Sequence, residues 1–403
     1  MAKNKKKWVK FRHRVIVKLA ACILKPIMKI KYHVKAEKFK EEKKRQYLIL
    51  FNHQTAGDQF FVSMSFNRPV YYLASEDLFS NGWISRLLRW AVAPIPIKKQ
   101  ATDARAVLNC MRVRKEGGTI ALSPEGNRTF SGRTGYMKDA IVPFVKALKM
   151  PLAFYRIEGG YGVQPRWSDC IRKGKMRSYV SKVIEPEEYL AMPDEELFAL
   201  IQKELYVDEA VTGAEFRHKE QAQYLERAAY YCPDCGFSVF ESDKDIIACK
   251  KCGKRVRYMP DKSLQGVNCD FPYRFYADWY DAQSEYLNHL DVLKYTDEPL
   301  YKDTAGFYEV ILYKNKQLLA KEAQISLYGD RVEIEMNGEV IKMPFEEISV
   351  AAVLGRNKLN LYFGGKVYQL KADSRFNALK YVQICYRAKN LQKGEENGKF
   401  LGL

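Results

Sequence analysis

Residues 47–58 read YLILFNHQTAGD, an apolar run that gives way to a polar loop. A short apolar run bounded by polar residues is typical of a buried strand. His53 follows the end of that strand, and Asp58 lies five positions further on. A carboxylate beside an imidazole fixes its tautomer and leaves the other ring nitrogen free to accept a proton. The pair therefore fits a general base, although the same spacing also occurs in ordinary polar loops.

A second polar stretch, SPEGNR at residues 123–128, follows another predicted strand at 118–122. Together the two stretches resemble the lysophosphatidic acid acyltransferase family of glycerolipid acyltransferases. That family has an Asn-His-x-x-x-x-Asp block and a later Pro-Glu-Gly-x-Arg block. Fainter likenesses lie at residues 95–99 (IPIKK) and 150–155 (MPLAFY), and the resemblance covers roughly residues 30–215. Departures are residues 54–57, Ser123 in place of Phe, and Asn127 in place of Thr.

The resemblance implies a glycerophosphate acyltransferase-like fold and acyl transfer without an acyl-enzyme or a catalytic cofactor. Acyl-CoA or acyl-carrier protein would be the donor. The acceptor would be a lysophospholipid, 1-acyl-sn-glycerol 3-phosphate, which gives phosphatidic acid in phospholipid biosynthesis. His53 would then be the general base and Asp58 its orienting carboxylate. The oxyanion would need backbone N–H donors, which the sequence does not identify.

The same resemblance suggests which residues bind the acceptor. Arg128 offers a planar guanidinium suited to phosphate. Lys99 stands where the family carries Arg and would add a point charge. Glu125 would orient Arg128 or a substrate hydroxyl, and Gly126 would allow close approach of the backbone. Arg133 and Lys138 are further candidates, although each also fits a solvated surface charge. Pro151 would shape the floor of the pocket or simply start a strand.

Residues 31–215 alternate strand-like and helix-like stretches, which predicts a mixed α/β sheet covered by helices. The predicted strands are 31–36, 47–51, 69–74, 118–122, 152–157 and 177–184. The predicted helices are 83–92, 104–114, 138–149 and 193–205. Both polar stretches then lie at strand ends, where catalytic loops gather.

The chain has 403 residues, so two or three domains are expected. Its net charge is +19. Residues 1–50 hold 17 Lys and Arg against three Glu, which concentrates the charge at one end. Residues 1–30 predict a basic amphipathic helix at a membrane interface, kinked or ended by Pro26. A helix packed on the next domain with a solvated polar face is the alternative. We expect peripheral attachment at the cytoplasmic face, because the apolar run is too short to span a bilayer.

Residues 229–258 carry two Cys-x-x-Cys pairs, each followed by glycine. Two such pairs predict a zinc ribbon, in which four thiolates close a structural site. The predicted ligands are Cys232, Cys235, Cys249 and Cys252. A redox role for the first pair is the alternative reading.

The rest of the chain predicts three further segments. Residues 259–304 form an aromatic-rich helical connector. Residues 305–390 form an all-β, barrel-like domain of about seven short strands with a C-terminal helix, a pattern that resembles a pleckstrin-homology domain. Residues 391–403 form a disordered tail.

Two other classes of function remain open from the sequence. The chain could be a catalytically inactive lipid-binding or scaffolding protein on the acyltransferase fold, because residues 54–57 depart from the family pattern. Nucleic-acid binding through the ribbon is less favoured, because the basic terminus offers no aromatic stacking platform. Membrane lipids, the lysophospholipid and the acyl donor are the expected partners, and a protein partner for the C-terminal segments is not identified.

Overall fold

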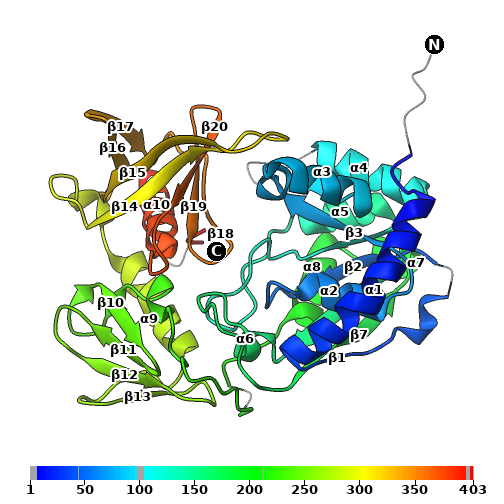
Figure 1. Cartoon of the computed structure of the whole chain (residues 1–403), viewed down its shortest axis with the longest axis horizontal. Helices are drawn as coiled ribbons and strands as arrows, with labels where there is room; N and C mark the ends of the chain where they lie inside the picture. The colour runs from blue at the N-terminus through cyan, green and yellow to red at the C-terminus, as the bar shows by residue number, and fades with distance from the viewer. Residues whose placement is uncertain (1–6, 44, 98–103, 212, 396–399, 403) are drawn as a thin grey trace.

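The computed structural model describes residues 7–43, 45–97, 104–211, 213–395 and 400–402. Two lobes lie side by side in Figure 1, one formed by the first half of the chain and one by the second. We call them the N-terminal lobe and the C-terminal lobe. Loops of the N-terminal lobe fill the region between them.

The N-terminal lobe is built on a seven-stranded sheet of order β1-β7-β6-β2-β5-β3-β4. Neighbouring strands run parallel except β6 and β7, which are antiparallel, so the predicted mixed sheet is confirmed. Its strands are β1 Val34–Ala36, β2 Leu48–Phe51, β3 Val70–Ser75, β4 Ile95–Ile97, β5 Thr119–Leu122, β6 Leu152–Glu158 and β7 Met176–Ile184.

Helices cover both faces of this sheet, as the uniformly apolar β2 requires. Leu48 and Leu50 join the core under α4, α5, α7 and α8, whereas Ile49 and Phe51 join the core under α1 and α2. The helices are α1 Phe11–Tyr32, α2 Asp58–Ser65, α3 Gly82–Ala91, α4 Ala104–Lys115, α5 Ile141–Leu148, α6 Gly160–Val163, α7 Pro186–Leu190 and α8 Asp194–Leu205. Short 3-10 turns are η1 Lys40–Glu42 and η2 Glu76–Phe79.

Helix α1 differs from the prediction at both ends. It begins at Phe11, and it continues through Pro26 to Tyr32, so the first two residues of the predicted strand 31–36 are helical. Met28 and Tyr32 are buried against the sheet, and this packing holds the helix beyond the proline. No helix among the described residues has both the length and the apolar character needed to cross a bilayer.

The C-terminal lobe begins with the predicted ribbon. A two-stranded sheet of β8 and β9 precedes a four-stranded sheet of order β10-β11-β12-β13. This second sheet extends to Gly266, beyond the predicted ribbon boundary at residue 258. The strands are β8 Tyr231–Cys232, β9 Gly236–Phe237, β10 Phe240–Asp243, β11 Ile246–Cys249, β12 Arg255–Tyr258 and β13 Leu264–Gly266.

A second seven-stranded sheet follows, with order β17-β16-β15-β14-β20-β19-β18 and only antiparallel pairs among its described strands. It forms a half-barrel against helix α10 Ala378–Gln392, which confirms the predicted β domain with its final helix. The strands are β14 Tyr301–Glu309, β15 Gln317–Leu327, β16 Arg331–Met336, β17 Glu339–Pro344, β18 Val350–Leu354, β19 Lys358–Phe363 and β20 Lys366–Lys371. The likeness to a pleckstrin-homology domain stays a prediction.

Ribbon, connector and half-barrel share one hydrophobic core, which also takes in Phe130 and Trp167 from the N-terminal lobe. The connector supplies helix α9 Tyr276–His289 and the turn η4 Val292–Lys294, and the turn η3 Leu225–Arg227 precedes the ribbon. The predicted segments are therefore parts of one packed unit.

The predicted disordered tail is wrong for the part of it that the structure describes. Helix α10 runs on to Gln392. Phe400 stacks on Tyr136 of the N-terminal lobe at 4.4 Å between ring centroids, and Leu401 is buried.

Candidate active site

The two polar stretches meet at one edge of the first sheet, because β2 and β5 are parallel neighbours and both end there. Asn52 fixes the end of β2 to β6. Its side-chain amide donates to the carbonyl of Ile157 and accepts from the N–H of the same residue, both at 2.8 Å. Asn52 is fully buried, and the loop that follows it therefore leaves the sheet at a defined point.

His53 and Asp58 form the predicted pair. The Nδ1 atom of His53 lies 2.7 Å from Oδ2 of Asp58, which is the first residue of α2 and is fully buried. The imidazole keeps 26% of its side chain exposed. Because Nδ1 faces the carboxylate, Nε2 is the ring atom left to meet a substrate.

Asp58 is held by three further donors. Its carboxylate accepts from the N–H groups of Gln54, at 2.7 Å, and Thr55, at 2.9 Å, and from the hydroxyl of Thr55 at 2.7 Å. Gly57 in turn donates its N–H to the Thr55 hydroxyl. Residues 54–57, which depart from the pattern of the resembling family, thus build the turn that orients the carboxylate of Asp58.

The surroundings of His53 both lower and raise its pKa. Burial lowers it, the hydrogen bond and charge of Asp58 raise it, and the positive charges of Arg128 and Arg166 lower it further. Burial is the largest effect, so the pKa lies below the ordinary 6.5. The imidazole is then neutral at pH 7, which is the state that a base requires.

Glu125 binds two backbone N–H groups of the site. Its Oε1 accepts the backbone N–H of His53 and its Oε2 that of Gly135, each at 2.7 Å. Burial raises the pKa of this carboxyl group to about 8. In the described part of the chain it ties the two motif loops together and does not bond Arg128. Gly126 adopts a φ of +66°, and a Cβ there would meet no protein atom within 4 Å, so the turn itself favours glycine.

Arg128 lies near enough to His53 for its positive charge to lower the pKa of the imidazole. Its Nη1 atom is buried and has no hydrogen-bond partner among the described residues. Burial, and then the charge of Arg356 from the C-terminal lobe, lower the pKa of its guanidinium to about 10. A half-buried guanidinium whose Nη1 atom lacks a partner among the described residues is a ready partner for an anionic group.

Lys99, the remaining predicted acceptor ligand, lies outside the described residues. Arg133 is engaged elsewhere, because its guanidinium pairs with Asp208, Asp278 and Asp281. Lys138 is exposed. Pro151 precedes the start of β6, at the opposite end of the strand from His53, so the suggestion that it shapes the pocket floor is wrong.

The sequence did not indicate two residues of the site, Arg166 and Tyr32. Arg166 is 2% exposed and donates to three backbone carbonyl groups, one of which is that of Arg128. Tyr32, near the end of α1, is buried and donates its hydroxyl to Gln164 at 3.1 Å. Neither residue lies in a polar motif, and only the tertiary fold brings them near His53.

The four ribbon cysteines form a separate cluster, with all Sγ atoms within 4.8 Å of one another. The Sγ atoms of Cys232 and Cys252 are 3.7 Å apart. Tetrahedral zinc with Zn–S bonds of about 2.3 Å places its sulfur ligands about 3.8 Å apart, so the cluster fits zinc. Gly236 and Gly253 take φ values of +67° and +75°, which turn the backbone after each cysteine pair as expected.

Comparison with known proteins finds a match for each of these two regions of the chain. Residues 30–155, which include both motif loops, match the family model described as acyltransferase. This part of the chain therefore has the sequence pattern of an acyltransferase domain. Residues 225–260 match a zinc-ribbon family model described as the 7 kDa subunit of DNA-directed RNA polymerase.

Among solved structures, the chain is similar to the crystal structure of the 1-acyl-sn-glycerophosphate (LPA) acyltransferase PlsC from Thermotoga maritima. The likeness has 19% sequence identity and a TM-score of 0.40, and covers 47% of this chain and 77% of that one. None of the curated protein sequences compared matches the chain.

Proposed function

We propose that the acyltransferase domain transfers an acyl group from a thioester donor to the free hydroxyl of a lysophospholipid. The acceptor would be 1-acyl-sn-glycerol 3-phosphate and the product phosphatidic acid. The observation that carries the proposal is the 2.7 Å contact between His53 Nδ1 and the buried Asp58. The positive charge of Arg128 acts on the same histidine, and its Nη1 atom has no hydrogen-bond partner among the described residues. This pairs a base for a hydroxyl group with a cation for a phosphate.

In this mechanism, Nε2 of neutral His53 removes the proton of the acceptor hydroxyl as its oxygen attacks the thioester carbonyl. General-base assistance of this kind contributes about 10²–10⁴-fold to the rate. Asp58 stays ionised, holds the proton on Nδ1 and stabilises the imidazolium. The tetrahedral adduct then collapses, the C–S bond breaks, and the imidazolium returns the proton to the leaving thiolate. The new ester bond forms directly, so no acyl-enzyme arises.

A membrane location would bring the enzyme to its acceptor. Helix α1 buries one face and exposes another that carries an apolar row: Phe11, Val15, Leu19, Ile23 and Ile30. Helix α3 contacts α1 and exposes Trp83, Leu87 and Trp90. Exposed apolar groups on this scale are typical of an interaction surface.

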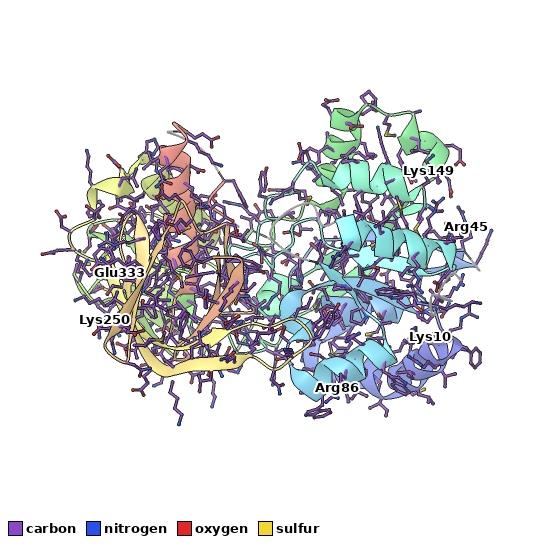
Figure 2. All side chains as sticks on the ribbon, turned by 90° about the horizontal axis from the view of Figure 1, so that it is seen from above. Lys10, Arg45, Arg86, Lys149, Lys250 and Glu333 are labelled. Atoms are coloured by element: carbon purple, nitrogen blue, oxygen red, sulfur yellow. The ribbon has the colours of Figure 1, made fainter. Side chains whose placement is uncertain are left out.

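Basic residues surround this apolar surface. An open cavity of about 630 Å³ between α1 and α3 is lined by Lys7, Lys10, Arg12, Arg86 and Arg89 among others, with no acidic side chain among the residues that line it. Figure 2 shows Lys10 and Arg86 on the same side of the N-terminal lobe, away from Lys250 and Glu333. Each basic residue near an anionic bilayer adds about 1 kcal/mol of attraction. We infer peripheral binding to an anionic surface, on the cytoplasmic side, where thiols such as those of the ribbon stay reduced.

A panel of acceptors and donors tests the proposed reaction. Purified full-length protein is mixed with lysophosphatidate, other lysophospholipids or monoacylglycerol, each with acyl-CoA and with acyl-carrier protein. We expect fastest transfer to lysophosphatidate, because Arg128 favours a phosphate. Fastest transfer to an acceptor without a phosphomonoester would contradict the proposed acceptor, and no transfer in any combination would favour the inactive scaffold.

A further inference from the structure

The C-terminal lobe reaches the acyltransferase site through the turn between β18 and β19. Arg166 donates from Nε to the carbonyl of Gly355 at 3.0 Å and from Nη2 to that of Val353 at 2.8 Å. Its Nη1 donates to the carbonyl of Arg128 at 2.8 Å. One buried guanidinium therefore holds the backbone of Arg128 and the residue before Arg356. Figure 1 shows β18 at the side of the C-terminal lobe that faces the other lobe.

Arg166 itself is unavailable to a ligand. It is 2% exposed, its three donor atoms are used by backbone carbonyl groups, and its guanidinium lies over the ring of Phe130 at 4.2 Å. It acts as a positioning residue, because it fixes two other arginines relative to each other across the lobe boundary.

The positive charge of Arg356 is only partly balanced by a neighbouring carboxylate. Its Nε lies 3.2 Å from Oδ1 of Asp169, and its side chain is 33% exposed. The same carboxylate receives two hydrogen bonds from the buried Arg227, at 2.7 and 3.2 Å. One negative charge is therefore shared by two guanidinium groups, and the pair as a whole remains positive.

The charge of Arg356 acts on two residues of the site, Arg128 and Tyr32. It lowers the pKa of Arg128, and it is among the charges that act on the Tyr32 hydroxyl together with Asp58 and Arg128. Arg128 and Arg356 are both half-buried, and their like charges repel each other, which costs free energy unless an anion lies between them. A phosphomonoester offers three oxygens and up to two negative charges, and it suits two guanidinium forks.

We propose that Arg356 of the C-terminal lobe completes the phosphate-binding site whose other half is Arg128, so that acceptor recognition depends on both lobes. The inference rests on the proposed function, and it names the group of the acceptor that the second lobe recognises. It also gives the half-barrel a role, because its β18–β19 turn would distinguish acceptors with a phosphomonoester from neutral ones.

Direct binding tests this site separately from catalysis. A short-chain, monomeric lysophosphatidate is titrated into the full-length protein by calorimetry. An Arg356→Ala variant should bind it about 10- to 100-fold more weakly, as expected for the loss of a charge-assisted contact. Arg356→Lys should recover part of the loss. Lys342→Ala, on the exposed side of β17, is the matched control and should bind like the unaltered protein.

Equal affinity in the Arg356→Ala variant and the unaltered protein would overturn the inference, as would absence of measurable binding in the unaltered protein. Acyl transfer with intact protein is measured in parallel. Loss of lysophosphatidate binding on removal of Arg356, in a protein that transfers no acyl group, would support the site and contradict the proposed reaction. In an active protein, Arg356→Ala should raise KM for lysophosphatidate more than it changes kcat, and should lower the preference for lysophosphatidate over monoacylglycerol.

Discussion

Replacement of Asp58 by asparagine should abolish most of the catalytic rate while the fold persists. In the structure Oδ2 of Asp58 faces the Nδ1 atom of His53 and the N–H of Gln54, and Thr55 donates to Oδ1 from its hydroxyl and to both oxygens from its N–H. Asparagine can place its one oxygen toward Thr55. Its amide NH₂ then donates to Nδ1 and moves the ring proton to Nε2, the atom that must accept the substrate proton.

The size of both effects follows from these contacts. Loss of the base should lower kcat by about 10²–10⁴-fold, which corresponds to about 3–5 kcal/mol of the activation barrier. The N–H of Gln54 loses its acceptor, which should cost about 1–3 kcal/mol of folding stability.

The assay compares kcat and the free energy of unfolding for Asp58→Asn with those of a matched variant, Glu42→Gln. Glu42 is 2% exposed and accepts the N–H groups of Asn67 and Arg68 at 2.7 and 3.1 Å, but it has no histidine beside it. We expect a similar loss of stability in both variants and a large loss of kcat in Asp58→Asn alone. An Asp58→Asn protein with nearly normal kcat, or an equal fall of kcat in both variants, would refute the reasoning.

Three further outcomes are expected. First, kcat/KM should rise with pH through a pKa below 6.5 and then level off, because burial lowers the pKa of His53 and only the neutral ring is a base; a rise centred well above 6.5 would contradict this. Second, metal analysis should find one zinc per chain, and chelation or Cys252→Ser should lower the unfolding temperature, since ribbon folding is coupled to metal binding. The exposed Cys22→Ser is the control, and zinc-free protein of unchanged stability would count against the site. Third, Leu19→Glu on the exposed face of α1 should reduce flotation with anionic vesicles, whereas Val340→Glu, at an exposed position on β17, should not; equal flotation of the two variants would argue against the membrane surface.

Local patterns were enough to predict the sheet and the motif loops. The apolar run at β2 fixes a strand buried on both faces, and the position of His53 directly after it determines which edge of the sheet carries the site. The spacing of His53 and Asp58 also follows from local geometry, because the five-residue loop and the first residue of α2 close one hydrogen-bonded turn.

Contacts between segments far apart in the sequence could not be predicted from local patterns. Arg166 and Arg356 are 190 positions apart in the chain, and only the contact between the lobes brings them together. The helix at Pro26 continues because Met28 and Tyr32 pack on the sheet, a gain that the local rule for proline ignores. Of the two partners expected for Glu125, Arg128 was wrong, since the carboxyl group binds backbone N–H groups from loops far apart in sequence. A substrate hydroxyl stays a prediction.

The most direct test of the account compares acyl transfer by the unaltered full-length protein and a His53→Ala variant, with lysophosphatidate as acceptor and acyl-CoA or acyl-carrier protein as donor. The account predicts phosphatidic acid from the unaltered protein and a rate lower by about 10²–10⁴-fold in the variant. Full activity of the variant would contradict the assignment of His53 as the base.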